Sequence, residues 1–583
     1  MVLWSVLLAT VFVVAPSLSN PTVTGKYFYF SLAVLAASLV AAFRLFGGQA
    51  AFRICATDLL VLCFAAWAGV SFIVNHAHPG MKLWMFVLLV PLYLVIRTTL
   101  HDRNMIQPLV WVIVAVVTVE ALWGFLQLRG FLKSYHSLFA LSGSFFNPGP
   151  YAGFLACGVP LALYCVINSR SRPVKILGFI CLITVGMILP ATMSRAAWIA
   201  AVAGIIPVIL HSSIFNIQSK IINQKSKILF PLFIGFFVAV ALYGLYSFKK
   251  QSADGRILIW RVSADLVITK PLTGSGLGSF QALYDGAQAD FILSGKATRK
   301  QRAIVDSPEY AFNEYVQITV EHGIIGLLLF MSVLFSFFVR RDKYAGADSV
   351  VFAVHGSLVA FCVFAMFSYP FSVLALTILF VVLAAMSASL SQPVERLHAQ
   401  WVSVAAGVLC VAMAGYASAE ILPRYTAYRE WKSAQVLYNI GEFENAVNNY
   451  QHLYPKLNRQ KEFLFEYARC LSATSQYDAS NTILSRFLLF GSDPVIYNCM
   501  GDNFKNLGDY EKAEKMYFRA SQIVPSRHLP LYLLMKLYQE TGQIEKANVM
   551  AKTLLEKPVK VHSATIREIQ EEARKLLDKP IDE

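Results

Sequence analysis

A small set of charged residues stands at the edges of long apolar segments in this 583-residue chain. Arg195 is the only charge in the sequence TMSRAAW, which separates two apolar runs. A guanidinium at a membrane surface presents a rigid fork of N–H donors that matches a phosphate group, although lone arginines there also serve as interfacial anchors. Arg195 is therefore a candidate phosphate ligand.

A second group of candidates lies in the sequence DGRILIWRVSADLVITKPLTGSGLGSF. Arg256 and Trp260 are four residues apart and share a helix face, whereas Arg261 points elsewhere. The glycines of residues 274–280 resemble a phosphate cradle, but no strand of a βαβ unit precedes them. We expect them to form a tight re-entrant turn.

Two carboxylates, Glu314 and Glu321, precede another apolar run and are one residue short of two helical turns apart. Each can act as a general base or cap the helix. Glu120 lies inside an apolar run with Gln127 two turns later, and is either functional or a neutral group hydrogen-bonded between helices. Asn147 opens an Asn-Pro-Gly-Pro turn, after which small residues favour close helix packing.

The composition places these residues in a membrane protein. Apolar residues make up 56% of the chain, charged residues 15%, and the mean hydropathy is +0.54. These values exclude a protein that is soluble throughout. No basic face on a soluble domain indicates nucleic-acid binding, and no spacing of the nine cysteines predicts a zinc site or disulfide framework.

Apolar runs long enough, or nearly long enough, to cross a bilayer recur through the first 420 positions. We predict thirteen transmembrane helices, at residues 1–18, 27–43, 58–74, 81–96, 105–128, 151–167, 174–190, 196–210, 228–246, 324–339, 350–367, 371–387 and 401–419. The first run lacks the basic residues of a signal peptide and is predicted to be an anchor.

Basic residues in the short connections predict the orientation, because Lys and Arg are retained in the cytoplasm. Fourteen lie in even-numbered connections and five in short odd-numbered ones. This count predicts a cytoplasmic N-terminus. The Arg195 turn, the long loop 247–323 and everything after the last span then face the outside.

The C-terminal region contains an internal repeat. Gly441, Phe443, Ala446 and Tyr450 have the same offsets as a second set, and degraded copies begin at Ser475 and Gly542. The second set is Gly508, Tyr510, Ala513 and Tyr517. Steps of 34, 33 and 34 residues are typical of tetratricopeptide repeats.

The predicted fold class is thus all-α, with a polytopic membrane helical bundle at residues 1–423 followed by a soluble α-solenoid of the tetratricopeptide type at 424–583. The groove of such an array is a candidate site for a protein partner.

Taken in order, the motifs resemble those of the bacterial O-antigen ligase superfamily, which includes O-antigen polymerases and protein O-oligosaccharyltransferases. The resemblance covers roughly residues 128–387. It rests on five segments: Asn147-Pro148, Ser194-Arg195, the Arg256 and Trp260 helix, the turn at 271–280 and the helix start at 313–323.

This resemblance implies a metal-independent, inverting transfer with no cofactor. A glycan would move en bloc from undecaprenyl diphosphate to an acceptor hydroxyl at the outer face of the bacterial inner membrane. Arg195 and Arg256 would stabilise the leaving diphosphate, with Glu314 as general base. The expected substrate-binding residues are Arg261, Trp260, Asn313, Glu321 and Asn147.

The sequence departs from the ligase pattern at Phe312, where that group has a histidine. Either a carboxylate of the following helix replaces the base, or attack follows departure of the diphosphate. The acceptor, which is a lipid, a polysaccharide or a protein, stays open. The alternatives are a transporter or a non-catalytic scaffold that recruits partners through its repeats.

Overall fold

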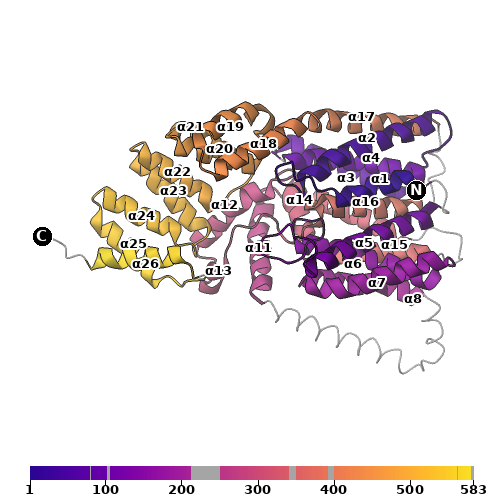
Figure 1. The fold of residues 1–583 in the computed structure, drawn as a ribbon, viewed down its shortest axis with the longest axis horizontal. Helices are drawn as coiled ribbons and strands as arrows, with labels where there is room; N and C mark the ends of the chain where they lie inside the picture. Colours follow the sequence, from indigo (N-terminus) through magenta and orange to yellow (C-terminus); the bar gives the residue numbers. More distant parts are fainter. Residues whose placement is uncertain are drawn as a thin grey trace, which may run out of the picture. The chain divides into compact units, whose positions relative to one another are not determined.

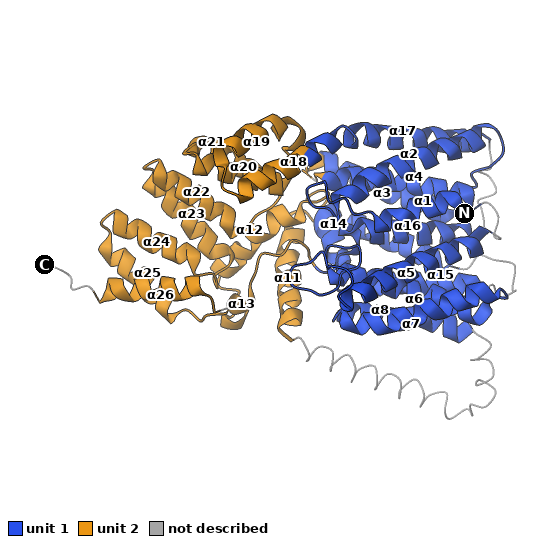
Figure 2. Cartoon of the chain, in the orientation of Figure 1, with its two compact units in different colours: residues 1–73, 81–248, 312–429 blue, residues 74–80, 249–311, 430–583 orange. Residues whose placement is uncertain are grey.

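The computed structural model describes residues 1–78, 80–100, 105–211, 250–339, 349–390, 400–560 and 562–578. Every regular element in these ranges is a helix, as the sequence predicts (Figure 1). The chain forms two compact units (Figure 2). Unit 1 comprises Met1–Ile73, Met81–Phe248 and Phe312–Arg429, and unit 2 comprises Val74–Gly80, Lys249–Ala311 and Glu430–Glu583.

Unit 1 is a bundle of apolar helices. Its helices are α1 (Val2–Leu8), η1 (Ala9–Phe12), α2 (Thr24–Phe46), α3 (Ala56–Val74), α4 (Met81–Thr99), α5 (Ile106–Leu128), α6 (Pro148–Asn168), α7 (Arg172–Ala191), α8 (Arg195–His211), α14 (Glu314–Phe338), α15 (Ser349–Ala365), η3 (Pro370–Ser372), α16 (Leu374–Ser389) and α17 (Gln400–Ile421).

Eight helices in the described part of the chain are long and apolar enough to cross a membrane. They correspond to eight predicted spans, and the last of them continues from α17 into α18 (Arg424–Asn439). Four further predicted spans are shorter apolar helices, at Val2–Phe12, Arg195–His211, Ser349–Ala365 and Leu374–Ser389. The predicted span 228–246 lies outside the described residues, so thirteen spans are not confirmed.

The first predicted span shows why counting apolar runs in the sequence overestimates the number of membrane-spanning helices. Its α-helix ends at Leu8 and becomes a 3-10 turn that ends at Phe12. At a rise of about 1.5 Å per residue, these residues reach roughly half of the ~30 Å hydrocarbon thickness. The run is apolar because its residues pack inside the bundle, where Leu7 and Val11 are fully buried.

Small residues bring three helices of unit 1 into close contact, as the sequence around Gly153 predicts. A Cβ atom on Gly153 of α6 would lie 2.3 Å from the Phe364 ring of α15. A Cβ on Gly356 of α15 would lie 2.3 Å from the Gly204 carbonyl of α8. Helices α8 and α15 therefore pack backbone to backbone, and Gly153 makes room on α6 for the Phe364 ring, a close packing that membrane helices obtain from small residues.

Unit 2 combines the tetratricopeptide helices with the loop that the sequence places between two spans. From the loop it includes α11 (Lys250–Thr269), α12 (Phe280–Leu293) and α13 (Arg299–Ile304). The array consists of α18 followed by α19 (Phe443–Leu457), α20 (Lys461–Ala473), α21 (Tyr477–Phe487), α22 (Pro494–Asn506), α23 (Tyr510–Ile523), α24 (Leu529–Glu540), α25 (Ile544–Glu556) and α26 (Ala564–Leu577).

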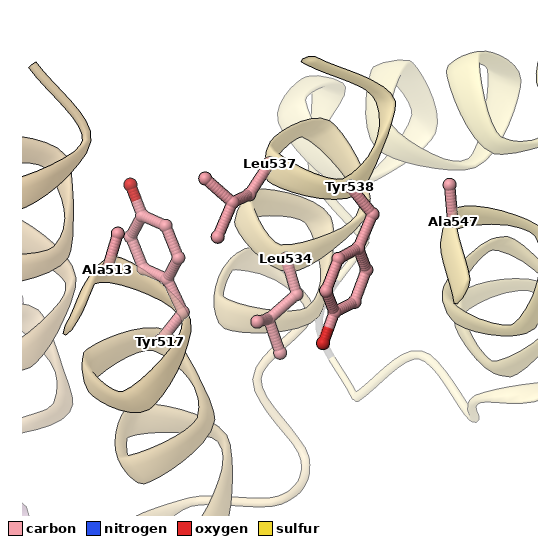
Figure 3. Packing of buried hydrophobic residues seen from close by; sticks show 6 residues of the cluster. All are labelled: Ala513, Tyr517, Leu534, Leu537, Tyr538 and Ala547. Carbon is pink, nitrogen blue, oxygen red and sulfur yellow. The ribbon is translucent and has the colours of Figure 1, made fainter. Parts of the chain in front are cut away.

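The repeat periodicity is confirmed in the helices. The repeat positions Ala446, Tyr450, Ala513 and Tyr517 are buried, whereas Phe443 is half-buried and Tyr510 is exposed. Ala513, Tyr517, Leu534, Leu537, Tyr538 and Ala547 form one core between α23, α24 and α25 (Figure 3). The turn before each second helix needs a left-handed residue. Glycine supplies it three times, at φ between 73 and 83°, and Ser475 adopts φ 61° in the degraded copy.

Candidate active site

The start of α14 carries three of the predicted residues. Asn313 is its N-cap, and the side-chain oxygen accepts from the backbone N–H groups of Tyr315 at 3.0 Å and Val316 at 3.2 Å. The residue before it, Phe312, has φ 51° and packs edge to face on Tyr369. Asn313, not Glu314, therefore caps this helix, and one of the two roles open to Glu314 is filled by its neighbour.

Glu314 is nevertheless held in place. It is 3% exposed, and its Oε1 accepts a hydrogen bond of 2.7 Å from the backbone N–H of Phe371. Phe371 lies in the turn η3 that leads into α16. A carboxylate at the first position of a helix, fixed by a second element, is geometrically suited to accept a proton from a group that approaches the helix end.

The helix α14 breaks at Gly323, which has φ 70° and ψ −175°. The break frees the carbonyls of Glu321 and His322 from the helix ladder, and two side chains of α3 take them. Ser71 donates to Glu321 O at 3.0 Å, and Trp67 donates to His322 O at 2.9 Å. The predicted span that begins at residue 324 is thus the second half of an interrupted helix.

Glu321 and Gln317 lie on the first half of the interrupted helix. The Gln317 amide donates to Glu321 Oε1 at 3.2 Å, and both side chains are buried. His322 is 4% exposed, and its Nδ1 has no hydrogen-bond partner among the described residues. Glu321 and Glu314 thus both lie on the part of α14 that precedes Gly323, one residue short of two turns apart.

The segment before Asn147 is held by the two polar residues that the fifth apolar run contains. Glu120 Oε2 accepts from Ser144 N at 3.1 Å. Gln127 Oε1 accepts from Ser142 N at 2.9 Å and from Gly143 N at 2.7 Å. Glu120 is fully buried, and its contacts favour the structural interpretation over a pathway residue.

A buried lysine joins this segment, and the sequence analysis missed it. Lys26 of α2 donates to Val11 O and to Ser144 Oγ, the latter at 3.2 Å. The partners are distant in sequence, so no local pattern could have paired them. Asn147 itself is the N-cap of α6 and accepts from Gly149 N at 2.8 Å. Its side-chain oxygen is therefore used by its own helix.

Arg195 is the first residue of α8 and is half-buried. The turn before it is fixed at both sides. Met193 adopts φ 54°, and the Trp198 indole donates to Leu189 O of α7 at 2.9 Å. The guanidinium thus starts from a rigid corner between two apolar helices, as the sequence predicts.

The remaining predicted residues lie on α11 in unit 2. Trp260 Nε1 donates to Ala311 O at 2.9 Å, and the Arg261 guanidinium lies 5.2 Å from the centroid of the Phe291 ring. Arg256 is half-buried, one turn before Trp260 on the same face. Trp260 contacts Ala311 and Arg261 contacts Phe291, which is consistent with the prediction that Arg261 points away from the face shared by Arg256 and Trp260.

The glycine-rich segment between α11 and α12 forms a turn, as predicted. Gly274, Gly276 and Gly278 all have positive φ, between 66 and 93°. Alternating left-handed residues would be strained for any side chain, so the glycines are required by the backbone path. The segment joins two helices rather than a strand and a helix, which agrees with the rejection of a nucleotide cradle.

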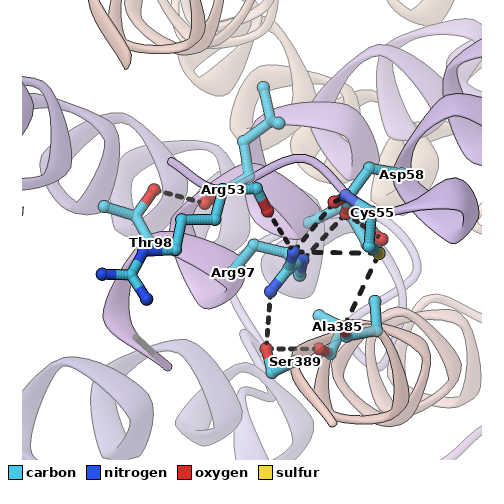
Figure 4. Close-up of polar contacts among 10 residues, drawn as sticks. Arg53, Cys55, Asp58, Arg97, Thr98, Ala385 and Ser389 are labelled. Carbon is cyan, nitrogen blue, oxygen red and sulfur yellow. Dashed lines mark hydrogen bonds and ion pairs between the residues drawn. The ribbon is translucent and has the colours of Figure 1, made fainter. Parts of the chain in front are cut away.

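Arg97 and Asp58 form a buried ion pair of unit 1 beside Ser389, the last residue of α16 (Figure 4). Arg97 donates to both oxygens of Asp58 at 2.8 Å, to Ser389 Oγ at 2.9 Å and to Arg53 O at 2.8 Å. Tyr93 adds a bond of 2.6 Å to Asp58. Each nitrogen of the Arg97 guanidinium has a hydrogen-bond partner within unit 1, which is typical of an ion pair with a structural role.

Among the described residues, no group of three or more His, Cys, Asp or Glu side chains is arranged to hold a metal ion. The predicted site residues divide between the two compact units. Asn147, Arg195, Asn313, Glu314 and Glu321 belong to unit 1, and Arg256, Trp260 and Arg261 belong to unit 2.

Comparison with known families adds a decisive observation. Residues 136–331 match the family described as O-antigen ligase, and this range contains every predicted site residue. The chain carries an O-antigen ligase domain. Residues 428–491 match the family of YpiA-like, C-terminal tetratricopeptide repeats, which agrees with the periodicity of the array.

Curated relatives of the ligase domain are proteins of Rickettsia that bear the name "Putative polysaccharide ligase". Those of Rickettsia typhi and Rickettsia prowazekii are each 28% identical over 30% of this chain and 43% of their own length. That of Rickettsia conorii is 30% identical over 19% of this chain and 26% of its own length. The match spans less than half the length of these relatives.

Proposed function

We propose that this protein is a membrane glycan transferase that moves a glycan en bloc from a polyprenyl diphosphate carrier, of the undecaprenyl type, to an acceptor hydroxyl. The observation that carries the proposal is the O-antigen ligase domain, in which Arg195 and the fixed, buried Glu314 stand at helix starts and Arg256 lies on α11. The transfer inverts the anomeric carbon in one displacement.

The two arginines bind the diphosphate of the donor. As the bond between the anomeric carbon and the phosphate oxygen breaks, the leaving group takes the electron pair and gains negative charge. Guanidiniums fixed at that position stabilise this charge more in the transition state than in the bound donor. Arg195 starts from the rigid corner of α7 and α8, and Arg256 from the face of α11 that Trp260 secures.

The acceptor hydroxyl forms the new bond to the anomeric carbon and loses its proton to Glu314. The backbone N–H of Phe371 positions the carboxylate. Because Asn313 caps the helix, the Glu314 side chain is not used as the cap. This assignment replaces the family histidine, whose position Phe312 occupies. Glu321, Asn147, Trp260 and Arg261 contribute to the sugar and lipid-phosphate contacts of the same site.

The orientation follows from the ends of α16. Its first turn lies beside Glu314, and Ser389 at its last turn bonds Arg97, about 24 Å away at 1.5 Å per residue. Arg97 and Arg53 belong to connections that the positive-inside count places in the cytoplasm. This count supports the proposal that Glu314 faces the outer side of the bacterial inner membrane, and the same count is the basis for proposing that the residues after the last span face outward.

The test measures release of polyprenyl diphosphate from a lipid-linked glycan in membranes that contain the full-length protein. Arg195→Ala and Arg256→Ala should each lower the release at least about a hundredfold, because each removes a charge that acts in the transition state. Lys296→Ala removes a surface cation that only pairs with Asp265 and serves as control. Unchanged release in both arginine variants would refute the proposal.

A deletion strain identifies the acceptor. Loss of long-chain lipopolysaccharide indicates a lipid, loss of capsule or exopolysaccharide a growing polymer, and loss of glycoproteins a protein. A non-catalytic scaffold, the second candidate, rests on Phe312 and on the repeat array. It would retain partner binding through the array and show no turnover with any donor.

A further inference from the structure

An extended segment, residues 305–309, links α13 to the start of α14 and runs along the repeat array. All of its contacts described below lie within unit 2. The segment has no helical structure, and Val305 at its beginning is 2% exposed. A segment outside any sheet needs partners for its backbone, and the array supplies them while the Asp306 and Glu309 side chains stay exposed.

The contacts follow the repeat period. Lys560 Nζ donates to Val305 O at 3.3 Å, and Arg527 pairs with the Asp306 carboxylate at 3.5 Å. The Ser307 hydroxyl lies 3.4 Å from Ser492 O, and Lys461 pairs with the Glu309 carboxylate. As the segment advances, its partners step backward by 33, 35 and 31 residues, about one repeat at a time.

The four partners also share a structural position. Each belongs to the connection between two repeats, at or just before the first residue of α20, α22, α24 or α26. Three are cations and meet a carboxylate or a carbonyl of the segment, so charge and spacing agree. Equivalent positions in successive repeats form one edge of an α-solenoid.

Helix α12 secures the segment from its other side. Gln288 is 1% exposed, and its amide donates to Asp306 O at 2.9 Å and to Ile523 O at 2.8 Å. It thereby ties the segment to α23 of the array. The Ser307 hydroxyl donates to the buried Asp285 at 2.6 Å. The segment thus contacts both α12 and the inter-repeat edge.

We propose that the inter-repeat edge of the tetratricopeptide array is a binding site whose ligand is the chain's own segment 305–309, and that this contact positions Trp260 and Ala311 for the transfer reaction. The second half rests on the proposed function. Ala311 lies two residues beyond Glu309, accepts from Trp260, and immediately precedes Phe312 and the Asn313 cap in the chain.

The array accordingly positions a segment that leads to the site, rather than serving only as a recruiting module. Lys461, Arg527 and Gln288 are positioning residues, since each contacts the segment and none is assigned to the donor or the acceptor. A partner that recognises this edge would carry an acidic extended peptide and would displace the segment. The concave groove of the array is a different surface.

A charge exchange tests the contact in the full-length protein. Glu309→Lys opposes two lysines across the edge, and Glu309→Lys with Lys461→Glu restores an opposite pair. Hydrogen–deuterium exchange of peptides covering 305–311 should become about fivefold faster or more in the single variant and return to the wild-type rate in the double variant. Lys505→Ala breaks a pair with Glu540 inside the array and serves as control.

Gln288→Leu provides a second perturbation that leaves the surface charge unchanged. It removes both amide donors, so exchange should rise in residues 305–311 and not in α24 to α26. If the segment exchanges as fast in the wild type as in the variants, or if the charge exchange fails to restore protection, the edge does not bind the segment and the proposal is overturned.

Transfer activity decides the positioning role. Glycan transfer should fall about tenfold in Glu309→Lys and recover in the double variant, because misplacing an active-site group by about 1 Å costs rates of that order or more. Faster exchange with unchanged transfer would overturn that role. A wild-type protein that protects the segment but transfers no glycan would contradict the proposed function and leave the intramolecular ligand established.

Discussion

The indole N–H of Trp260 lies 2.9 Å from the carbonyl oxygen of Ala311, 51 positions later in the chain. The bond connects the helix that carries Arg256 with the residue that precedes the start of α14. Ala311 is fully buried, so its carbonyl cannot turn to water if the indole donor is lost. The Trp260 side chain thus attaches the helix of Arg256, a candidate phosphate ligand, to the backbone that leads into the Asn313 cap.

Replacing Trp260 with Phe keeps the ring and removes this donor. Loss of this buried hydrogen bond should cost about 0.5–1.5 kcal/mol of stability, and the looser attachment of the helix that carries Arg256 should lower kcat roughly tenfold. Glycan release measured at saturating donor checks it. Trp431→Phe, which removes an indole bond to Glu466 in the array, should leave release unchanged.

Glu314→Gln separates a base from a structural contact. The amide oxygen of Gln can still accept from Phe371 N, so the turn before α16 should stay in place. Transfer should fall by about 10²–10⁴ because the amide cannot take the acceptor proton. The comparison is with Glu321→Gln, which we expect to have a smaller effect. Full activity of Glu314→Gln would show that the reaction needs no base at this position.

The charge of Asp285 makes unit 2 sensitive to pH. Burial raises the pKa of this carboxyl to about 7, and the nearby Asp493 and Asp306 also raise it, whereas the Ser307 hydroxyl and the Arg527 guanidinium lower it. The folded state therefore holds a proton that the unfolded chain releases near its ordinary pKa. Stability should be greatest below that ordinary pKa and decline as the pH rises toward 7.

Asp285→Asn keeps an oxygen for Ser307 and removes the charge. We expect the variant to unfold at a temperature roughly 3 to 6 °C above the wild type at pH 8 and to differ little at pH 5. Thermal unfolding of the full-length protein, followed by exchange of the α12 peptides, measures the difference. A variant that is less stable than the wild type at pH 8 would show that the ionised carboxylate is the favoured form.

Local patterns in the sequence predicted most of the elements of this protein. The repeat steps identified the array, including the Ser475 turn, because a left-handed residue before each second helix leaves a fixed offset. Asn313 and Asn147 are the N-caps of α14 and α6, a role that the sequence analysis did not assign to them. The helix break at Gly323 was not predicted, because the apolar run continues beyond it and the α3 side chains that donate to the freed carbonyls lie 250 and 255 residues earlier.

The contacts that organise the site depended on partners distant in sequence. Nothing around Lys26 indicates Ser144, and nothing in residues 305–309 indicates four successive repeats. The external loop therefore seemed part of the membrane domain, whereas its helices belong to the same compact unit as the array. Polar pairing across the fold is fixed by packing, which a one-dimensional pattern does not contain.

The buried ion pair between Arg97 and Asp58 yields a prediction about stability rather than catalysis. Asp58 is 1% exposed and receives both donors of one guanidinium, together with the hydroxyl of Tyr93 and the backbone N–H of Cys55. Arg97→Leu leaves an unpaired buried carboxylate and should cost about 3–5 kcal/mol. Arg97→Leu with Asp58→Leu removes both charges and should be less harmful than the single change. The fraction of detergent-solubilised protein that remains folded after heating, measured for the wild type and both variants, gives their order of stability.

The ion pair also predicts an unchanged activity. Because Arg97 lies about 24 Å along α16 from Glu314, the folded fraction of the double variant should transfer glycan at the wild-type rate. A double variant that is folded yet inactive would place Arg97 in the reaction instead.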